Sequence, residues 1–108
     1  MERERRRAPR YPLIADAEVT EIASNTKLKA RTVDVNWHGC FLEMLNPMPQ
    51  GSRIQLTLFH RGQRFNAAGT VVFVAPNLGV GVAFTQVSAV DLDVIGNWLS
   101  ELILAAKS

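Results

Sequence analysis

Short segments in which apolar and polar residues alternate recur along most of this chain, and they constrain its fold more than any other feature. Alternation with a period of two is the pattern of a β-strand that buries one face. The segments follow one another at intervals of about ten residues with short turns between them, which is typical of an antiparallel barrel or sandwich. We expect six strands, over residues 17–22, 28–35, 40–45, 54–58, 64–75 and 80–84.

Turn-forming residues separate these strands. Asn25 is suited to a left-handed backbone conformation in the turn over residues 23–26. Residues 60–63, His-Arg-Gly-Gln, predict a tight hairpin with Gly62 at positive φ. A change in the phase of the alternation near Arg31 indicates a β-bulge.

The C-terminal segment has a helical period instead. Ser88 and Asp91 form a capping box, which marks the start of a helix. Apolar residues then recur three and four positions apart, so we expect one amphipathic helix over residues 88–106. Its apolar face should pack on the barrel, with a dimer contact or a partner groove as the alternative. That face consists of Ile95, Trp98, Leu99, Leu102, Ile103 and Ala106.

Length and composition are those of one globular domain. The chain has 108 residues, of which 47% are apolar and 20% charged, enough for one compact core. Its apolar runs are far shorter than the ~20 residues of a membrane span, and no apolar stretch follows the N-terminus as in a secretory signal. Cys40 is the only cysteine, which excludes an internal disulfide. We therefore expect a cytoplasmic protein.

Positive charge is concentrated at the N-terminus. Residues 1–10 hold five Arg and two Glu, a net charge of +3, whereas residues 11–108 hold seven basic and eight acidic side chains, a net charge of −1. Pro9 and Pro12 disfavour a helix on either side of Arg10. We expect residues 1–10 to form a flexible basic arm and residues 11–108 the folded domain. Taken alone, such an arm also fits a solvated tail that binds polyanions loosely.

Motifs for catalysis or metal binding are absent from the sequence. His38 and His60, with the single cysteine, do not have the spacing of a zinc site. The chain has no Gly-x-Ser-x-Gly elbow and no phosphate-binding loop, and Gly79-Val-Gly81 is typical of a tight turn into a strand. We expect a binding protein with no enzymatic activity, no metal site and no cofactor.

Two polar clusters remain, and their chemistry is complementary to guanine and phosphate. The first is Arg6-x-x-x-Arg10, whose flat guanidinium groups match phosphate oxygens and the O6/N7 edge of guanine. The second is Asp34-x-Asn36-x-x-Gly39. Asp34 can accept from the N1–H and N2–H₂ edge of guanine, Asn36 can donate or accept beside it, and Gly39 leaves room for a ligand or for backbone.

These two motifs resemble those of the PilZ domain, a bacterial receptor for cyclic di-GMP. That family carries Arg-x-x-x-Arg in an N-terminal arm, followed by Asp/Asn-x-Ser-x-x-Gly. Arg6 and Arg10 match the first motif, and Asp34 and Gly39 match the second, in which Asn36 stands where the family has Ser. The Gly-Val-Ala-Phe sequence over residues 81–84 also looks like the family's closing strand, so the resemblance covers essentially the whole chain.

The resemblance implies a mainly β fold, a six-stranded antiparallel PilZ-type β-barrel with a basic N-terminal arm and a C-terminal α-helix. It implies binding of cyclic di-GMP, upon which the arm reorients and alters a surface seen by an unidentified protein partner, with output in motility, biofilm or polysaccharide synthesis. In the family, an arginine directly before the first motif arginine is associated with binding of an intercalated ligand dimer, and Arg5 stands at that position here. The implied ligand-binding residues are Arg5, Arg6, Arg10, Asp34, Asn36 and Gly39, with Arg7 as a further candidate.

Two alternative functions stay open at this point. A PilZ-like adaptor with weak or absent cyclic di-GMP binding is favoured by Asn36, which either keeps the contact with a shifted geometry or crowds the base, and disfavoured by the intact arm. A nucleic-acid binder is disfavoured because the body is near neutral and shows few candidate stacking aromatics. Trp37 is expected to pack against the barrel rim, and Phe73 is the candidate stacking platform.

Overall fold

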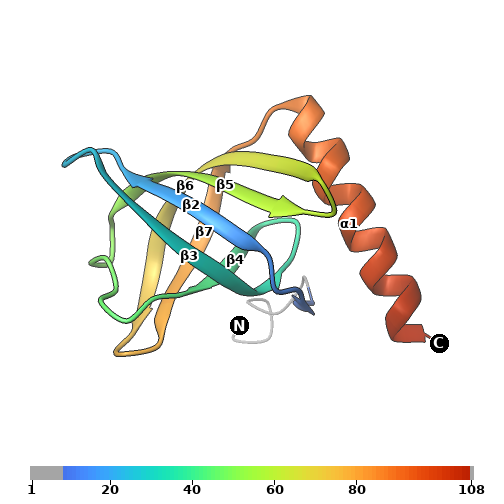
Figure 1. The fold of residues 1–108 in the computed structure, drawn as a ribbon, viewed down its shortest axis with the longest axis horizontal. Coiled ribbons are helices and arrows are strands. Elements are labelled where there is room, and N and C mark those ends of the chain that lie inside the picture. The colour runs from blue at the N-terminus through green and yellow to red at the C-terminus, as the bar shows by residue number, and fades with distance from the viewer. Residues whose placement is uncertain (1–8, 108) are drawn as a thin grey trace, which may run out of the picture.

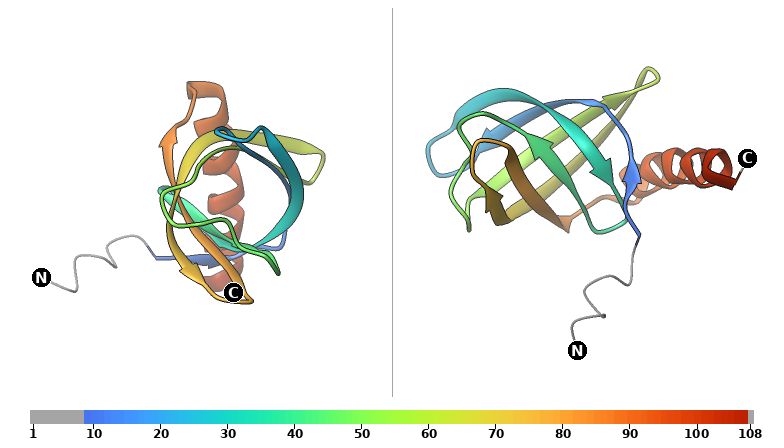
Figure 2. Two further views of the ribbon diagram at one scale, coloured as in Figure 1. Left: turned by 90° about the vertical axis from the view of Figure 1, so that its left-hand side faces the viewer. Right: turned by 90° about the horizontal axis from the view of Figure 1, so that it is seen from below.

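The computed structural model describes residues 9–107 and shows a closed antiparallel barrel with one helix across one end (Figure 1). Strands neighbour one another in the order β3-β2-β5-β6-β7-β4, and a further pairing of β3 with β4 closes the ring. Figure 2 shows this ring end-on in its left view, with the helix behind it. The predicted six-stranded barrel is confirmed. Its strands are β2 (Asp16–Glu21), β3 (Thr26–Val35), β4 (Gly39–Glu43), β5 (Arg53–His60), β6 (Gln63–Ala75) and β7 (Gly79–Gln86), and the helix is α1 (Ala89–Lys107).

The strand boundaries lie within two residues of those expected from the alternation. Two of the turns contain the positive φ angles expected at Asn25 and Gly62. Asn25 has a φ of 57°, and the hairpin between β5 and β6 places Arg61 and Gly62 at φ 54° and 75°. The third strand ends earlier than predicted, because the chain bends away after Glu43 and leaves Leu45 exposed.

A short additional strand, β1 (Tyr11–Pro12), pairs with the end of β3 and was not predicted. The segment that follows it is held by Thr32, which is almost fully buried. The Thr32 hydroxyl donates to the carbonyl oxygen of Leu13 and accepts from the amide of Ala15 at 2.9 Å. A buried hydroxyl with both partners satisfied fixes the chain firmly. The residues just after the predicted arm are therefore anchored to β3.

A β-bulge decides which side chains of β3 face outward near its end. The register of β3 against β4 shifts between Thr32 and Asp34, so that Val33 is the extra residue. Such a bulge changes the facing of the residues that follow it. Thr32 and Val35 consequently point into the core, whereas Asp34 faces outward. The bulge predicted near Arg31 thus exists, one to three residues further along.

The helix begins at the predicted cap and is tied there to the barrel. Ser88 Oγ accepts from the Asp91 amide at 3.2 Å and donates to Asp91 Oδ2 at 2.7 Å. Asp91 Oδ1 accepts from the amide of Asn66 on β6 at 2.8 Å. The first half of the apolar face is buried against the barrel end, but Ala106 is exposed because the helix runs past the barrel (Figure 1).

The core fills the barrel and the space under the helix. Inward-facing side chains alternate with outward-facing ones along the strands, as expected for a sheet with one buried face. Trp98 lies against the ring of Phe65, with ring centroids 6.3 Å apart, so the helix seals the barrel end. The largest fully buried side chains are those of Trp98, Phe65, Leu42, Ile54, Leu56, Leu58, Ile95, Leu99, Val19, Val35, Val71 and Val80.

Candidate functional site

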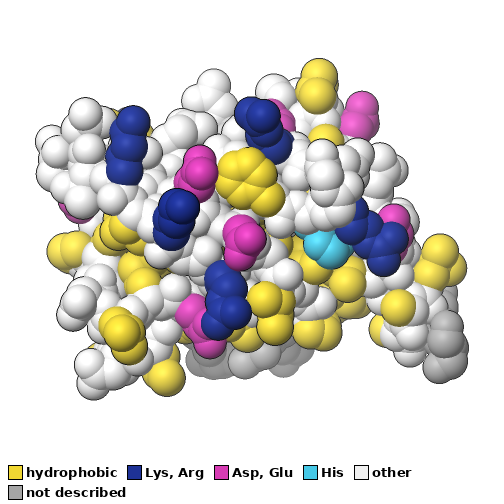
Figure 3. Space-filling model, in the orientation of Figure 1, with side chains coloured by type: hydrophobic (Ala, Val, Ile, Leu, Met, Phe, Trp, Pro, Cys, Tyr) yellow, Lys and Arg dark blue, Asp and Glu magenta, His cyan; other side chains and the backbone are white. Residues whose placement is uncertain are grey.

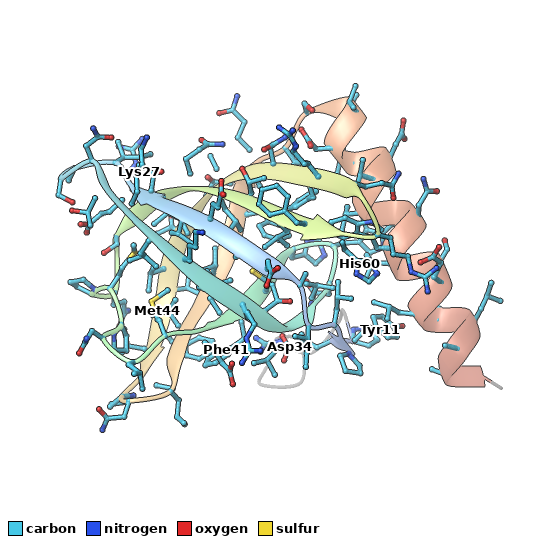
Figure 4. All side chains as sticks on the ribbon, viewed as in Figure 1. Tyr11, Lys27, Asp34, Phe41, Met44 and His60 are labelled. Carbon is cyan, nitrogen blue, oxygen red and sulfur yellow. The ribbon has the colours of Figure 1, made fainter. Side chains whose placement is uncertain are left out.

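Residues from four strands form one row across the outer face of the barrel. Asp34 on β3 lies opposite Phe41 on β4, Phe41 lies opposite Gly81 on β7, and Gly81 lies opposite Phe73 on β6. Residues in register on neighbouring strands share a face of the sheet. Asp34 and Phe41 accordingly lie side by side near the end of β3, beside the start of the described chain (Figure 4).

Phe41 and Phe73 form an aromatic patch in this row. Their ring centroids lie 5.9 Å apart and the ring planes differ by 29°. A Cβ atom at Gly81 would clash with the Phe73 ring, so the glycine is what lets this ring lie flat over β7. Phe73 remains 38% exposed, and an exposed aromatic face can stack on a nucleobase. Phe73 was the predicted stacking candidate, whereas Phe41 was missed, although its place between two inward-facing residues indicated that it faces outward.

Arg10 joins the acidic and aromatic ends of the row. Its Nη1 lies 3.9 Å from Asp34 Oδ1, and its Cζ lies 6.0 Å from the centroid of the Phe73 ring. The side chain is 50% exposed. An ion pair this long and this exposed contributes little stability, so the Arg10 guanidinium is available to a stronger anionic partner such as a phosphate.

The carboxylate of Asp34 is only partly satisfied. Oδ1 is buried and has no hydrogen-bond partner within the part of the chain that the structure describes. A buried acceptor left without a donor costs on the order of 1–3 kcal/mol, and such atoms commonly mark functional positions. The pKa of the neighbouring Cys40 thiol is raised to about 12, first by burial and then by the Asp34 charge, with Arg10 opposing. The negative charge of Asp34 therefore acts on a buried group in the barrel wall.

Asn36 closes the loop between β3 and β4. Its Oδ1 accepts from the amides of His38 at 2.7 Å and of Gly39 at 3.0 Å, and its own amide donates to the Gly39 carbonyl at 2.9 Å. This is an Asx-turn, in which the side chain mimics backbone and fixes the turn. The Asn36 carbonyl oxygen thus serves the loop itself and orients the residues that flank it.

Gly39 is required by the fold. It lies opposite Ala83 on β7, and a Cβ atom at this position would clash with the carbonyl oxygen of Val82. The sequence suggested that this glycine leaves room for either a ligand or a neighbouring backbone. The structure shows the close approach of the β7 backbone. Its amide contributes to the site indirectly, through the turn of Asn36.

Of the predicted ligand-binding residues, the structure brings Arg10 to Asp34 and places Asn36 in the loop that follows. The predicted arm contacts Arg5, Arg6 and Arg7 lie outside the described residues. Trp37, expected to pack against the barrel rim, lies in the loop between β3 and β4, and the edge of its ring approaches Gly96 of α1. Within residues 9–107 no three His, Cys, Asp or Glu side chains are grouped to hold a metal ion, and no helix is long and apolar enough to cross a membrane.

Away from this row, the barrel face in Figure 3 shows interspersed acidic and basic side chains. On neighbouring strands Glu18 lies opposite Lys29 and Asp16 opposite Arg31, and Arg31 also approaches Glu43 at 3.5 Å. Charges of both signs in register largely cancel. This face lacks the continuous basic surface of a nucleic-acid binder.

A shallow groove of about 750 Å³ lies at the other half of β3, apart from the row. It runs between β3 and the loops after β4 and β6, and its floor is mostly apolar. The charged groups at its rim are the same paired ones that cover the neighbouring strands. None of the predicted ligand-binding residues lines it. Its apolar lining residues are Leu28, Ala30, Met44, Leu45 and Leu78.

Comparison with known proteins assigns the chain to a family. The PilZ domain family matches residues 4–101, and the chain therefore belongs to the PilZ family. No curated protein matches it in sequence.

Solved structures share the fold at low sequence identity. YcgR from Escherichia coli in complex with c-di-GMP superposes with a TM-score of 0.78 at 18% identity, covering 95% of this chain and 48% of YcgR. The YcgR PilZ domain with c-di-GMP gives a TM-score of 0.75 at 18% identity and 95% coverage of both chains. MotI/DgrA, the inhibitor of motility from Bacillus subtilis, gives 0.77 at 10% identity, covering 95% of this chain and 53% of MotI. This chain spans about half the length of YcgR and MotI.

Proposed function

We propose that this PilZ domain binds cyclic di-GMP and acts as a receptor without catalytic activity. The observation that carries the proposal is the buried Oδ1 of Asp34, which accepts no hydrogen bond from the described residues and lies beside the Arg10 guanidinium, which in turn lies near the Phe73 ring. YcgR has the same fold, and its structures in complex with c-di-GMP support the proposal.

The row offers each chemical group that a guanine nucleotide requires. The N1–H and N2–H₂ donors of guanine fit a carboxylate acceptor, and Asp34 supplies one. Arg10 supplies donors for a phosphate or for the O6/N7 edge. Phe73 supplies an exposed ring face on which a base can stack.

Arg10 covers the acceptor in the structure described here, since its Nη1 lies over Asp34 Oδ1 at 3.9 Å. A guanine edge that bonds to this oxygen displaces the guanidinium. The released Arg10 then pairs with phosphate, which is a stronger, charge-assisted partner. Ligand binding in this way exchanges a weak internal ion pair for two better contacts and moves the chain segment that carries Arg10.

The arm residues Arg5 and Arg6 complete the proposed site. Four residues of extended chain span up to about 14 Å, so Arg6 can reach any point on a nucleotide held between Arg10 and Asp34. Arg7 is within the same reach. Arg5 stands where the family has the residue that goes with a stacked pair of ligands, so the calorimetric stoichiometry distinguishes one bound ligand from two.

Calorimetry on the whole chain tests the receptor function. We expect cyclic di-GMP to bind with micromolar or better affinity, and GTP and a short RNA to give no comparable heat. Arg6→Ala should weaken binding at least tenfold, because charge-assisted hydrogen bonds contribute on the order of 1.5–3 kcal/mol. Arg53→Ala, an exposed arginine on β5, is the matched control and should stay within twofold. A folded sample that gives no heat with cyclic di-GMP, or an Arg6→Ala variant with unchanged affinity, would contradict the proposal.

A PilZ-like adaptor with weak or absent nucleotide binding is the second candidate. The observation that favours it is Asn36 itself, which stands at the family's Ser position and whose carbonyl oxygen is taken up by loop amides. An adaptor acts through protein contacts in the absence of ligand. Because the fold neighbour MotI/DgrA is an inhibitor of motility, motility is the first output to measure, with biofilm and polysaccharide synthesis as the others.

A further inference from the structure

The loop of the candidate site also contacts the C-terminal helix. Trp37 follows Asn36 in this loop, and the edge of its indole lies over Gly96 on α1. A Cβ atom at position 96 would lie 3.0 Å from Cη2 of Trp37 and 3.8 Å from both Cζ2 and Cζ3. Trp37 remains 49% exposed, so about half of the side chain is in solvent.

Gly96 has no backbone reason to be a glycine. It lies inside α1, and its φ is not among the positive values of the chain. Glycine within a helix is less favourable than alanine. The three heavy atoms nearest to the position that a Cβ would take all belong to Trp37, apart from the chain neighbours of Gly96 and the helix backbone. The missing side chain therefore forms a notch that fits the indole edge.

Both ends of this contact are held in place. On the loop side, the Asn36 turn fixes the residues around Trp37, and the His38 carbonyl accepts from the amide of Phe84 on β7 at 2.8 Å. On the helix side, Trp98 Nε1 donates to Gln63 Oε1 at 3.1 Å. The indole therefore bridges two anchored parts of the fold, the loop and the helix.

We propose that Trp37, seated in the notch at Gly96, is a positioning residue that couples the loop of residues 36–39 to helix α1. Its ligand-dependent part rests on the proposed function: occupation of the site next to Asp34 shifts this loop and, through Trp37, the helix. The coupling itself is a property of the folded chain and exists without ligand. A protein partner that binds α1 would therefore respond to whether the site is occupied.

The contact is tested first by a double-mutant cycle in urea, without ligand. Gly96→Ala should lower the unfolding midpoint or leave it unchanged in the wild-type background, because the new methyl group pushes the indole away. In a Trp37→Ala background the same change should raise the midpoint, since only the better helix propensity of alanine remains. Ser100→Ala, an exposed helix position, is the control and should act equally in both backgrounds. Equal increases for Gly96→Ala in both backgrounds overturn the proposal.

The coupling is tested by loosening the loop and reading the helix. Asn36→Ala removes the side-chain oxygen that holds the turn. With Trp37 present, it should speed amide hydrogen exchange in α1 around residues 94–98, and in the Trp37→Ala background it should leave those rates unchanged. Equal effects in both backgrounds, or none in either, contradict a link through the indole.

Cyclic di-GMP provides the functional readout. Trp37→Ala should weaken its binding three- to tenfold and abolish the ligand-induced NMR shift changes of residues 94–98, while the changes at Asp34 and Phe41 persist. If affinity and helix shifts both match wild type, the coupling is wrong. If wild-type protein binds no cyclic di-GMP, the proposed function fails, whereas the unfolding cycle and the exchange measurements still decide the Trp37–Gly96 link.

Discussion

At the scale of the single residue, Asp34 combines two properties that bear on its proposed role. One oxygen is buried and accepts no hydrogen bond within residues 9–107, and the charge helps to raise the pKa of the neighbouring Cys40 thiol. Arg10 opposes this effect but lies too far away to neutralise the carboxylate fully. In the proposed function, a ligand that brings its own donors satisfies this acceptor.

The raised pKa of Cys40 predicts a pH dependence of stability. Its thiol titrates near 9.0 when unfolded and at about 12 when folded. Below pH 9 both states hold the proton, and the contribution to stability is fully present. Between these values the unfolded state alone loses it, so the free energy of unfolding falls as pH rises. Urea unfolding of wild type and Cys40→Ala across this range should show a shallower fall in the variant. Parallel pH profiles would argue against a buried, protonated thiol.

Asn36→Ser tests the departure from the family motif. The serine hydroxyl is shorter and cannot reach both loop amides as the Asn36 oxygen does. We expect cyclic di-GMP binding to weaken by a few-fold to about tenfold, the equivalent of roughly one hydrogen bond. Titrations of both proteins in the same buffer measure this. Tighter binding would show that the asparagine crowds the base, and unchanged affinity would remove position 36 from the site.

At the scale of the element, the start of α1 is an anchor as well as a cap. Asp91 accepts from the backbone amide of Asn66 on β6 and from the hydroxyl of Ser88. One carboxylate therefore fixes where the helix begins and how it meets the barrel. The position of the notch at Gly96 depends on this anchor, because the two lie on the same rigid helix.

Asp91→Ala should lower the free energy of unfolding by about 1–2 kcal/mol, since the cap and the link to β6 are lost together. Asp93→Ala is the matched control, because it removes the same charge from the same end of the helix dipole. Asp93 is exposed, and its loss should cost less than about 0.5 kcal/mol. Urea denaturation of both variants gives the comparison. Equal losses would mean that charge alone, and not the bond to Asn66, stabilises this end.

At the scale of the whole molecule, ligand binding should stabilise the fold. A ligand that binds only the native state at a hundred times its Kd adds about 2.7 kcal/mol. The melting temperature with cyclic di-GMP should therefore rise by on the order of 10 °C for a domain of this size, and GTP should leave it unchanged. In Arg10→Ala, which keeps the barrel but loses the cation next to Asp34, the rise should shrink. An equal rise in wild type and Arg10→Ala would place the ligand elsewhere.

The predicted arm provides a second test at this scale. Residues 3–10 should show amide relaxation like that of the barrel once cyclic di-GMP is bound, and faster local motion without it, because the arginines are ordered by the ligand. NMR relaxation measured in both states checks this. Identical relaxation in the two states would mean that the arm takes no part in binding.

Features that depend on a few consecutive residues were predictable from the sequence. Strand alternation, the left-handed Asn25 and Gly62, and the Ser88–Asp91 cap arise from local backbone preferences and short-range hydrogen bonds, and the structure contains them. The motif residues from Arg6 to Gly39 were likewise legible, because the chemistry of guanine and phosphate restricts which side chains serve them. Their roles in binding stay a prediction.

Features that join distant parts of the chain were decided only by the tertiary structure. The closure of β3 on β4, the alignment of Phe41 and Phe73 across Gly81, and the fit of Trp37 at Gly96 all depend on strand register and helix placement. A shift of one residue in register would turn Phe41 or Phe73 to the opposite face of the sheet. Turns and the hydrophobic pattern fix the register of neighbouring strands in a hairpin, but which distant strands pair, and where the helix lies, depends on the packing of the whole core. The amino-acid order alone could therefore name these residues without placing them together.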